Sequence, residues 1–532
     1  PEFVWHGIDP RRFDGGKVVM TRLLELDNYD LIQSEFSSDL LWDLFDGTRD
    51  HMNLAHECLD RHSGKGRAIS VKHDSGDIEH LDYDELIIST SQFAHQLEKS
   101  GIKRGERVAI ILEPGKAFYT SLFGAIKRGA IAVPMFTLFG PDALALRIRD
   151  CTPSIIVADK HLGSIKAQFP NIPVLRADRF FLESLKTHPE EYLSSTKASD
   201  LSVFQYTSGT TRELPEAVKH TQRSVVTLMI AALYGTGLVP GDTYFCPSSP
   251  AWGHGLWHGT IAPLALGVHI VSYAGQFDPK MVYAALEQLK VNNFAAAATV
   301  YRMLRNSGYR DDYTINLSKC SFTGEPLDTN TFDWIKRSFG TAPASMYGTT
   351  EVGVIIVDYP GIKGHTVKPG ALGKPAPGNE VAILNGKNSL AKIDEIGEIS
   401  VKRKNSWFRV KDFGYKDNEG YFFHAGRSDD VIISAGWTMS AVEIENTLLT
   451  HPSVGEAAVI GVADSVRGQV ARAYLVLNAD APTQKDTIKA YMKEKLSKHE
   501  YPREIHFIKT LPKTPAGKVN RKALRDLAKL DG

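Results

Sequence analysis

The sequence contains few cysteines. Only four occur among 532 residues, and Cys58, Cys151, Cys246 and Cys320 lie far apart without a CxxC pair. This spacing argues against a disulfide framework and against a zinc ribbon. Reduced thiols fit the pattern best, so we expect a cytoplasmic protein.

The sequence also lacks net charge and long apolar runs. Lys and Arg together number 62, as do Asp and Glu, so the formal net charge is zero. A protein that bound nucleic acid through its overall field would be basic, so no nucleic-acid partner is expected, although a local anion site is allowed. No apolar run reaches the roughly 18 residues that a membrane-spanning helix needs.

What is present is a regular alternation of strands and helices. The pattern predicts helices over 83–101 and 117–128, and strands over 107–112, 130–134, 154–159, 267–271 and 294–300. Strands that alternate with helices of this length indicate parallel βαβ units. Residues 1–60 show no clear period and are interpreted as an N-terminal extension that wraps the surface.

The pattern changes twice towards the C-terminus. From about residue 370, glycine and proline separate short strands such as 397–401, which indicates an antiparallel or barrel-like part. After Arg427 the predicted order is helix (442–449), strands (457–462 and 473–477) and helix (484–496). The fold class is therefore α/β: a large N-terminal domain of stacked mixed βαβ sheets with a small barrel-like part, then a small α+β C-terminal domain.

One loop carries groups suited to phosphate. Small hydroxyl side chains surround Gly209 in the segment 207–211, where backbone and hydroxyl groups can both approach an anion closely. The segment lacks the GxxxxGK[ST] pattern of a P-loop. Taken alone, it is better interpreted as an ordinary Ser/Thr-rich turn.

Other polar residues favour a nucleotide. Glu351 follows a second hydroxyl-rich loop, as expected for a Mg²⁺ ligand beside phosphates. Asp412 is placed where it could accept hydrogen bonds from ribose hydroxyls, and Arg427 and Lys518 follow it. Each has an ordinary surface role as its alternative, but their joint occurrence in this order is hard to obtain by accident.

Four stretches carry a family resemblance. They are PAWGHGLWHGTIAPLALG (250–267), YGTTEVG (347–353), WFRVKDFGYKDNEGYFFHAGRSDDVI (407–432) and PKTPAGKVNRKALRD (512–526). From about residue 40 to its end, the chain resembles the adenylate-forming superfamily, which includes acyl-CoA synthetases, firefly luciferase and the adenylation domains of peptide synthetases. It looks most similar to the acetyl- and medium-chain acyl-CoA synthetases.

This resemblance implies a domain division and an activity. Residues 1–428 would form the adenylation domain with the ATP and acyl sites, and residues 429–532 would form a mobile C-terminal domain. The implied activity is that of an acid:CoA ligase, which uses ATP, Mg²⁺ and coenzyme A. A small to medium carboxylic acid would react first to acyl-AMP, with release of pyrophosphate, and then to the CoA thioester.

The resemblance also implies which residues bind the nucleotide. The loop that would wrap the β- and γ-phosphates consists of Thr207, Ser208, Gly209, Thr210 and Thr211. The residues that would surround the adenine are Gly324, Glu325, Pro326, Tyr347, Gly348 and Thr349. Asp412 would accept from the ribose hydroxyls, with Arg427 beside it.

For the reaction itself, the resemblance implies five further roles. Thr350 would touch the α-phosphate, Glu351 would hold Mg²⁺, and Lys518 would bridge the carboxylate and the α-phosphate. The C-terminal domain would turn about Asp429, and pantetheine would pass Gly436. In related enzymes the lysine matching Lys518 is acetylated, so this modification is expected here. A homodimer is compatible with the sequence, which does not determine the oligomeric state.

The chain departs from the family pattern at three positions. Arg212 stands where the phosphate loop usually has Gly, and Glu216 where it usually has Lys, so the loop's cation would come from Arg212 or Lys219. Thr438 stands where the family often has Arg after the glycine at 436. These changes leave the affinities for ATP and CoA open.

Acyl specificity is expected to depend on the segment 250–267. Its candidate substrate residues are Trp252, Gly253 and His254, with Trp257 and His258 nearby and Phe322 and Thr323 on a separate loop. A bulky Trp would shorten the site and favour small acids. Core packing is the alternative and is preferred for Trp257, while His254 is expected to be an aromatic wall, because a carboxylate needs no general base.

Three other functions remain open at this point. The enzyme could load a separate carrier protein instead of free CoA. It could be a catalytically weak adenylate-binding protein, which only Arg212, Glu216 and Thr438 favour. A luciferase-like oxygenase shares the first half-reaction and is a minority activity of the superfamily.

Overall fold

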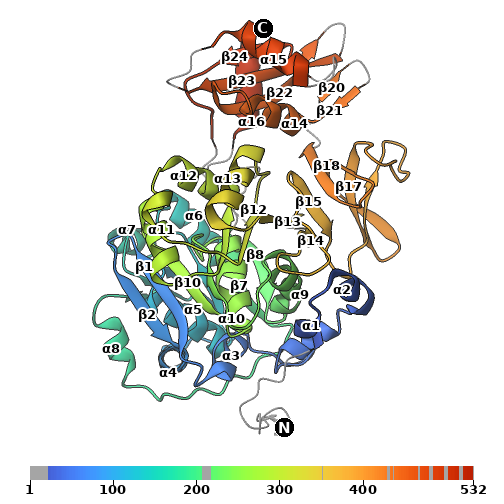
Figure 1. Ribbon diagram of the computed structural model, residues 1–532. Coiled ribbons are helices and arrows are strands. Elements are labelled where there is room, and N and C mark those ends of the chain that lie inside the picture. The colour runs from blue at the N-terminus through green and yellow to red at the C-terminus, as the bar shows by residue number, and fades with distance from the viewer. Residues whose placement is uncertain are drawn as a thin grey trace. The chain divides into compact units, whose positions relative to one another are not determined.

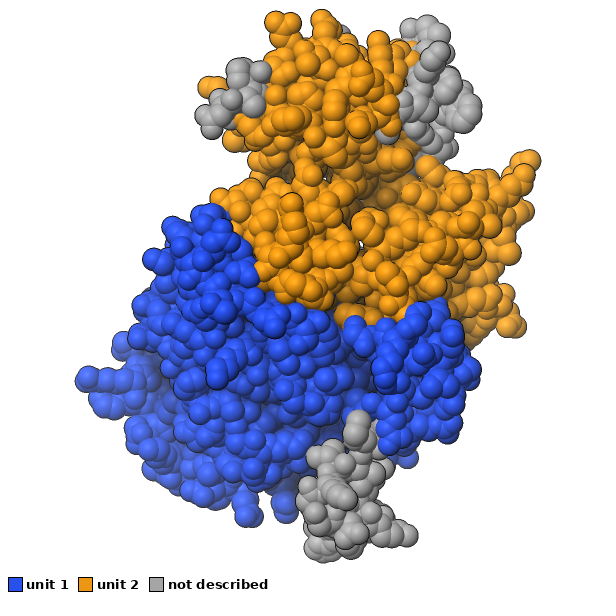
Figure 2. All heavy atoms as spheres, in the orientation of Figure 1, with its two compact units in different colours: residues 1–296, 307–320, 361–364 blue, residues 297–306, 321–360, 365–532 orange. Residues whose placement is uncertain are grey.

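The structure is a computed structural model. It describes residues 22–206, 217–349, 351–427, 432–434, 437–464, 468–478, 483–495, 501–513 and 519–530. The chain divides into two compact units (Figure 2). Unit 1 comprises residues 1–296, 307–320 and 361–364, and unit 2 comprises residues 297–306, 321–360 and 365–532. The expected division at residues 428 and 429 stays a prediction.

Unit 1 contains a six-stranded sheet in the order β6-β5-β3-β4-β7-β8 (Figure 1). Its strands are β3 (Arg107–Ile111), β4 (Ile131–Pro134), β5 (Ile155–Ala158), β6 (Val174–Arg176), β7 (Leu201–Tyr206) and β8 (Ala217–Thr221). All neighbours pair in parallel except β7 and β8. The helices of this region are α4 (Tyr83–Lys99), α5 (Lys116–Arg128), α6 (Pro141–Cys151), α7 (Leu162–Gln168) and α8 (Phe181–Leu185). The predicted βαβ units are therefore confirmed here.

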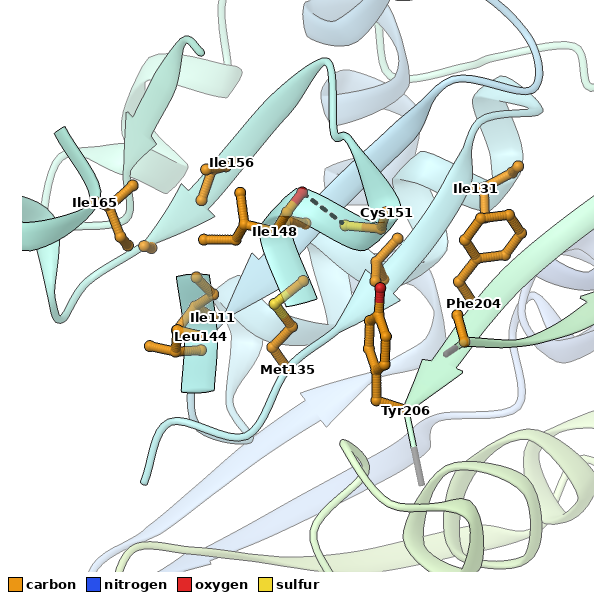
Figure 3. Close-up of a cluster of buried hydrophobic side chains, with 14 residues drawn as sticks. Ile111, Ile131, Met135, Leu144, Ile148, Cys151, Ile156, Ile165, Phe204 and Tyr206 are labelled. Carbon is orange, nitrogen blue, oxygen red and sulfur yellow. Dashed lines mark hydrogen bonds between the residues drawn. The ribbon is translucent and has the colours of Figure 1, made fainter. Parts of the chain in front are cut away.

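Local sequence explains where the long helices begin and end. Asp82 and Glu85 form a capping box at the start of α4, which satisfies backbone N–H groups of the first turn. Gly129 ends α5 with a φ of 79°, a left-handed conformation that glycine adopts without strain. Apolar side chains of the sheet and of α6 then pack into one buried cluster, which includes Ile111, Ile148 and Tyr206 (Figure 3).

Unit 1 contains a second group of strands. They are β1 (Arg67–His73), β2 (Ile78–Asp82), β9 (Thr243–Phe245), β10 (His269–Ala274) and β11 (Asn293–Ala297). β11, β9, β10 and β1 pair in parallel in this order, and β2 pairs antiparallel with β1. The associated helices are α9 (Ser224–Ile230), the π-helices η4 (Ala231–Gly235) and η5 (His254–Ile261), α10 (Ala262–Ala265), α11 (Pro279–Gln288) and the 3-10 helix η6 (Arg310–Asp312).

The interpretation of residues 1–60 as a surface extension is wrong for residues 40–60. This stretch forms the 3-10 helix η2 (Leu40–Leu44) and the helix α3 (Leu54–Cys58), after α1 (Arg22–Glu25) and α2 (Tyr29–Glu35). Leu41, Leu44 and Leu54 are buried. Asn53 donates to the carbonyl of Ile126 in α5, so the stretch belongs to the core. Helices of five residues are too short to show a helical period in the sequence.

Unit 2 begins with mixed structure and continues as antiparallel strands. Its helices here are α12 (Ala298–Asn306) and α13 (Thr329–Phe339). Its strands are β12 (Lys319–Thr323, of which 321–323 belong to unit 2), β13 (Pro343–Thr349), β14 (Gly353–Val357), β15 (Ala371–Pro375), β16 (Val381–Leu384), β17 (Gly397–Arg403), β18 (Ser406–Lys416) and β19 (Phe422–Arg427). The order is β16-β17-β18-β19-β15-β14-β13-β12. The antiparallel pairing expected after residue 370 is confirmed.

The last hundred residues of unit 2 form an α+β part with its own apolar cluster, as predicted. Its sheet has the order β21-β20-β23-β22, and β24 pairs in parallel with β23. The elements are β20 (Ile432–Ser434), β21 (Trp437–Met439), α14 (Ala441–Leu449), β22 (Val454–Asp464), β23 (Gly468–Leu477), α15 (Lys485–Lys495), β24 (Glu504–Phe507) and α16 (Arg521–Leu530).

Two further observations concern the whole described chain. All four cysteines lie within it; each is buried, and none forms a disulfide bond. Within the described ranges, no helix combines the length and the apolar character that crossing a bilayer requires.

Candidate active site

Tyr347 and Asp412 come together in unit 2. Tyr347 lies on β13, and its hydroxyl donates to Asp412 Oδ2 on β18 over 2.6 Å. Asp412 pairs in the antiparallel ladder with Arg427, the last residue of β19. The backbone thus places these two predicted nucleotide residues opposite each other, and the ring of His424, also on β19, lies 6.2 Å from that of Tyr347.

The loop Gly324–Pro326 follows β12 and is held by α12. Glu325 accepts hydrogen bonds from Thr299 and from Arg302, the latter over 3.0 Å. A second nitrogen of the Arg302 guanidinium donates to the Pro326 carbonyl over 3.2 Å, and its Nε donates to Asp328. One arginine therefore holds two residues of this loop and also Asp328, the residue before α13. The Thr323 hydroxyl, just before the loop, donates to the carbonyl of Met346 on β13.

The turn between β13 and β14 depends on glycine. Gly348 faces Gly353 so closely that an added Cβ would lie 2.1 Å from the Gly353 carbonyl oxygen, where no side chain fits. Within the described chain, the Thr349 hydroxyl is buried and has no hydrogen-bond partner. Glu351 is exposed on the turn. The turn therefore presents the Glu351 carboxylate at one end of the hairpin and keeps the Thr349 hydroxyl buried.

Several predicted residues lie outside the described residues. They are Thr207, Ser208, Gly209, Thr210, Thr211, Thr350, Asp429, Gly436 and Lys518, as well as Arg212 and Glu216. Some of their neighbours are described. Tyr206 and Ala217, which flank the phosphate segment 207–216, pair with each other in the sheet. An isolated β-bridge joins Lys513 to Val519, the residues that flank the segment 514–518 containing Lys518. Lys219, on β8, lies over the Phe204 ring.

Among the described residues, no group of three or more His, Cys, Asp or Glu side chains could hold a metal ion. A single exposed carboxylate such as Glu351 instead fits Mg²⁺, which commonly takes one or two protein carboxylates and completes its shell with substrate phosphates and water. The donor set of this chain is therefore compatible with a nucleotide-bound Mg²⁺.

The predicted acyl residues fall in different units. Trp252, Gly253 and His254 belong to unit 1, whereas Phe322 and Thr323 belong to unit 2. In unit 1, the Trp252 ring lies 5.3 Å from Phe136 and 5.6 Å from Phe139.

Trp257 and Gly253 pack against β7, the strand that leads to the phosphate segment. Trp257 is buried, as preferred from the sequence, and its Nε1 donates to Gln205 Oε1 over 2.8 Å. A Cβ at Gly253 would lie 2.7 Å from Gln205 Nε2. The His220 ring on β8 lies 4.5 Å from Trp257. The segment thus contacts the hairpin that carries the phosphate segment.

Two histidines lie one turn apart on the π-helix η5. The ring centroids of His254 and His258 are 6.0 Å apart. His254 Nδ1 is 3.0 Å from Ser248 Oγ and 3.7 Å from Cys246 Sγ. Burial lowers the pKa of His254 to about 4 and, with the nearby His254, that of His258 to about 3. Both imidazoles are therefore neutral at pH 7.

Sequence reasoning missed two groups that shape this site. Arg302 and Thr299 hold Glu325, but nothing in the sequence of a nine-residue helix indicates which distant loop it supports. Gln205 precedes the phosphate segment and looks like any strand residue until its bond to Trp257 is seen. A π-helix offered no sequence signal, although such helices often occur at functional sites.

The sequence profile of AMP-binding enzymes matches residues 59–407. The chain belongs to the AMP-binding enzyme family. The profile of the AMP-binding enzyme C-terminal domain matches residues 443–518 of the enzyme. The resemblance to the acyl-CoA synthetase branch of the adenylate-forming superfamily is thereby confirmed.

Relatives and a solved structure agree with this assignment. The enzyme is 29% identical to acetyl-coenzyme A synthetase of Bacillus subtilis (strain 168) over 521 residues, covering 89% of this chain and 90% of the relative. It is 30% identical to 4-hydroxybutyrate--CoA ligase 1 of Metallosphaera sedula over 490 residues, with 85% of each chain covered. An acyl-CoA synthetase structure from Brucella canis superimposes with a TM-score of 0.71 at 27% identity, covering 95% of this chain and 100% of that one.

Proposed function

We propose that this enzyme is an ATP-dependent acid:CoA ligase. A carboxylate oxygen attacks the α-phosphorus of ATP, and the bond to pyrophosphate breaks. The thiol of coenzyme A then attacks the acyl carbon, AMP leaves, and the thiol proton passes to solvent. The observation that carries the proposal is the match of both AMP-binding profiles together with acyl-CoA synthetase relatives along the chain.

The nucleoside would be bound by the loops of unit 2. Glu325 and Pro326 would flank the adenine, Tyr347 would pack on it, and Asp412 would accept from the ribose hydroxyls. A carboxylate has about four acceptor positions, so Asp412 can accept from Tyr347 and from ribose at once. Gly348 and Thr349, at the end of β13, would lie beside the nucleotide.

Charge neutralisation would come from Mg²⁺ and a lysine. Glu351 would hold Mg²⁺, which supplies positive charge beside the phosphates when bound. Thr350 would contact the α-phosphate, and Lys518 would bridge it to the attacking carboxylate. Two anions must meet in this step, so a fixed cation lowers the barrier.

The C-terminal part would act in the second half-reaction. Residues 429–532 would turn about Asp429 as a domain, remove Lys518 and let pantetheine pass Gly436. Acetylation of Lys518 would remove the charge that the first half-reaction needs. A cytoplasmic location and a homodimer belong to the same proposal.

The acid would be small. The two relatives are named for acids of two and four carbons. Trp252, packed with Phe136 and Phe139, supports a site shortened by aromatic rings.

The acceptor decides between a CoA ligase and a carrier-loading enzyme. The test incubates the full chain with ATP, Mg²⁺ and a panel of acids, with either coenzyme A or a phosphopantetheinylated carrier protein, and detects thioesters by mass spectrometry. Acid-dependent pyrophosphate with acyl-CoA is expected. Pyrophosphate with a thioester only on the carrier would contradict the proposed acceptor, and the absence of pyrophosphate would contradict adenylation.

A further inference from the structure

The last two residues of β7 hold the strand end from which the phosphate segment 207–216 departs. Successive side chains of a strand point to opposite faces of the sheet. Gln205 faces η5, where its Oε1 accepts a hydrogen bond from the Trp257 indole N–H over 2.8 Å. Tyr206 faces α6 and packs in the apolar cluster that includes Cys151 of that helix (Figure 3). The strand end is therefore held from both faces of the sheet.

The Tyr206 hydroxyl makes the polar contact with α6. It lies 2.6 Å from Asp150 Oδ2 and 3.0 Å from the carbonyl oxygen of Arg147. A hydroxyl has one proton to donate, and a carboxylate is the stronger acceptor, so the shorter contact is a charge-assisted hydrogen bond to Asp150. Asp150 is exposed, whereas Tyr206 is only 2% exposed. The bond thus joins a buried ring at the end of β7 to a helix residue that water also reaches.

The guanidinium of Arg147 lies against the same tyrosine. Its Cζ is 3.9 Å from the centroid of the Phe139 ring and 5.7 Å from that of the Tyr206 ring. A cation over the face of an aromatic ring is attracted to it. The helix α6 therefore contacts Tyr206 through the hydroxyl and through the ring, and both contacts oppose a shift of the strand end.

The position of Tyr206 bears on ATP because of the residues that follow it in the chain. Residues 207–211 would wrap the β- and γ-phosphates with backbone N–H and hydroxyl groups. Hydrogen bonds require donor–acceptor distances of about 2.7–3.2 Å, so a shift of the strand end would displace the donors of the segment from the phosphates. A misplacement of about 1 Å can cost about a hundredfold in rate.

We propose that Tyr206 and Asp150 are positioning residues for the first half-reaction: their hydrogen bond fixes the end of β7 so that the phosphate segment meets the β- and γ-phosphates of ATP. The proposal rests on the acid:CoA ligase function proposed above. Both residues act through the segment and not on the substrates. The acyl-AMP intermediate has no β- or γ-phosphate, because these leave as pyrophosphate. The second half-reaction therefore does not need this hydrogen bond.

The test measures both half-reactions of the full chain in Tyr206→Phe, which keeps the ring and removes only the hydroxyl. Exchange of labelled pyrophosphate into ATP, with Mg²⁺, without CoA and with each of a panel of C2 to C10 and aromatic acids, reports the first half-reaction. Synthetic acyl-AMP of the best acid, with CoA, reports the second. We expect kcat/KM for ATP in the exchange to fall at least tenfold, as for one hydrogen bond to a charged group. Conversion of acyl-AMP to acyl-CoA should stay within about threefold of wild type.

Variants of Asp150 identify the acceptor. In Asp150→Ala we expect the exchange to fall about fivefold or more, with acyl-AMP conversion within about threefold of wild type. Asp150→Asn keeps an acceptor oxygen and should retain more than half of the exchange. Two controls should change neither half-reaction more than about twofold. They are Asp142→Ala, another exposed aspartate of α6, and Tyr83→Phe, in which a buried tyrosine loses its bond to the Val268 carbonyl.

The split between the half-reactions decides the outcome. An equal loss of both in Tyr206→Phe overturns the proposal, because a hydroxyl that only stabilises the fold would affect both alike. Full exchange activity in Tyr206→Phe or in Asp150→Ala also overturns it, and each of these results leaves the ligase function standing. If Tyr206→Phe does not fold, Asp150→Ala decides by the same split, since its change lies at an exposed side chain. Wild type without acid-dependent exchange for any acid overturns the ligase function and this proposal together.

Discussion

The Tyr347 hydroxyl donates a 2.6 Å hydrogen bond to Asp412 across 65 positions of sequence. The bond joins β13, which leads into the turn before β14, to β18 of the antiparallel region. If adenine packs on Tyr347 and ribose bonds Asp412, the two halves of the nucleoside site are coupled through this contact. Loss of either group then disturbs the position of the other.

Tyr347→Phe should weaken ATP binding. The change keeps the ring and removes only the hydroxyl, so the carboxylate loses a charge-assisted hydrogen bond worth about 1.5–3 kcal/mol at most. We expect the KM for ATP to rise about three- to tenfold, with the KM for the acid nearly unchanged. Steady-state kinetics measures both. Tyr313→Phe, which loses a bond to the Lys280 carbonyl in unit 1, is the control. Equal effects in both variants would contradict a nucleoside role.

Arg302 should determine how firmly the loop 324–326, which we propose flanks the adenine, is held. Arg302→Met removes its bonds to Glu325, Pro326 and Asp328. We expect the preference for ATP over ITP, measured as a ratio of kcat/KM, to fall about tenfold, because the loop would no longer be fixed against the base. Arg305→Met is the matched control, since Arg305 bonds Asp328 and Thr331 but not the loop. A constant ratio in Arg302→Met would refute this role.

Gly348→Ala should distort the turn between β13 and β14, where we propose that the nucleotide binds. The new Cβ would lie 2.1 Å from the Gly353 carbonyl oxygen, so the backbone of the hairpin must move. We expect a loss of about 1–3 kcal/mol in stability by thermal denaturation and at least a tenfold rise in the KM for ATP. Gly386→Ala, where an added Cβ meets nothing within 4 Å, should change neither. Normal ATP kinetics in Gly348→Ala would show that the turn does not touch the nucleotide.

His56 should make unit 1 less stable at alkaline pH. Burial lowers the pKa of His56, but a 3.1 Å hydrogen bond to Asp46 and the carboxylate of Asp60, 3.8 Å from the ring, outweigh this effect and raise the pKa to about 9. The folded pKa lies above the unfolded value of about 6.5, so the stabilisation is complete below about pH 6.5 and is lost as the pH rises through about 9. The other charged groups nearby are Glu57, Arg61 and Lys127.

This pH dependence is measured as a difference between variants. The apparent free energy of unfolding of wild type minus that of His56→Gln should decrease by on the order of 3 kcal/mol between pH 6 and pH 10. Thr227→Ala, an exposed position on α9 of the same unit that carries no titratable group, serves as the control and should show a flat difference. A flat difference for His56→Gln as well would mean that the carboxylates do not hold the charged imidazole.

Regular elements could be predicted because their patterns are local. The helix predicted over 83–101 is α4 (Tyr83–Lys99), whose apolar spacing and capping residues are visible in sequence. The strand predicted over 294–300 instead ends at Ala297, where α12 begins. An alanine-rich run is compatible with a strand and with a helix. The residues after Ala297 are helical because a helix buries Tyr301 and Leu304 on one face.

The residues of the candidate site could be predicted only where a family motif contains them. Tyr347, Asp412 and the loop 324–326 came from the family resemblance, and the structure places them in one unit. The side chains that hold the site residues in place could not be predicted. Arg302 bonds Glu325, and Trp257 bonds Gln205, only because the fold brings residues distant in sequence together. The early stretch 40–60 was misjudged for the same reason, because its burial depends on α5.

Lys518→Ala offers the most direct test of the central claim that an acyl-AMP intermediate links two separate half-reactions. Wild type and variant are each given acid, ATP, Mg²⁺ and CoA, and separately the synthetic acyl-AMP with CoA. Pyrophosphate and acyl-CoA are measured in each case. The account predicts that the variant loses acid-dependent pyrophosphate release at least a hundredfold but still converts acyl-AMP to acyl-CoA within about threefold of wild type. Full pyrophosphate release in the variant, or no acyl-CoA from acyl-AMP with wild type, would contradict it.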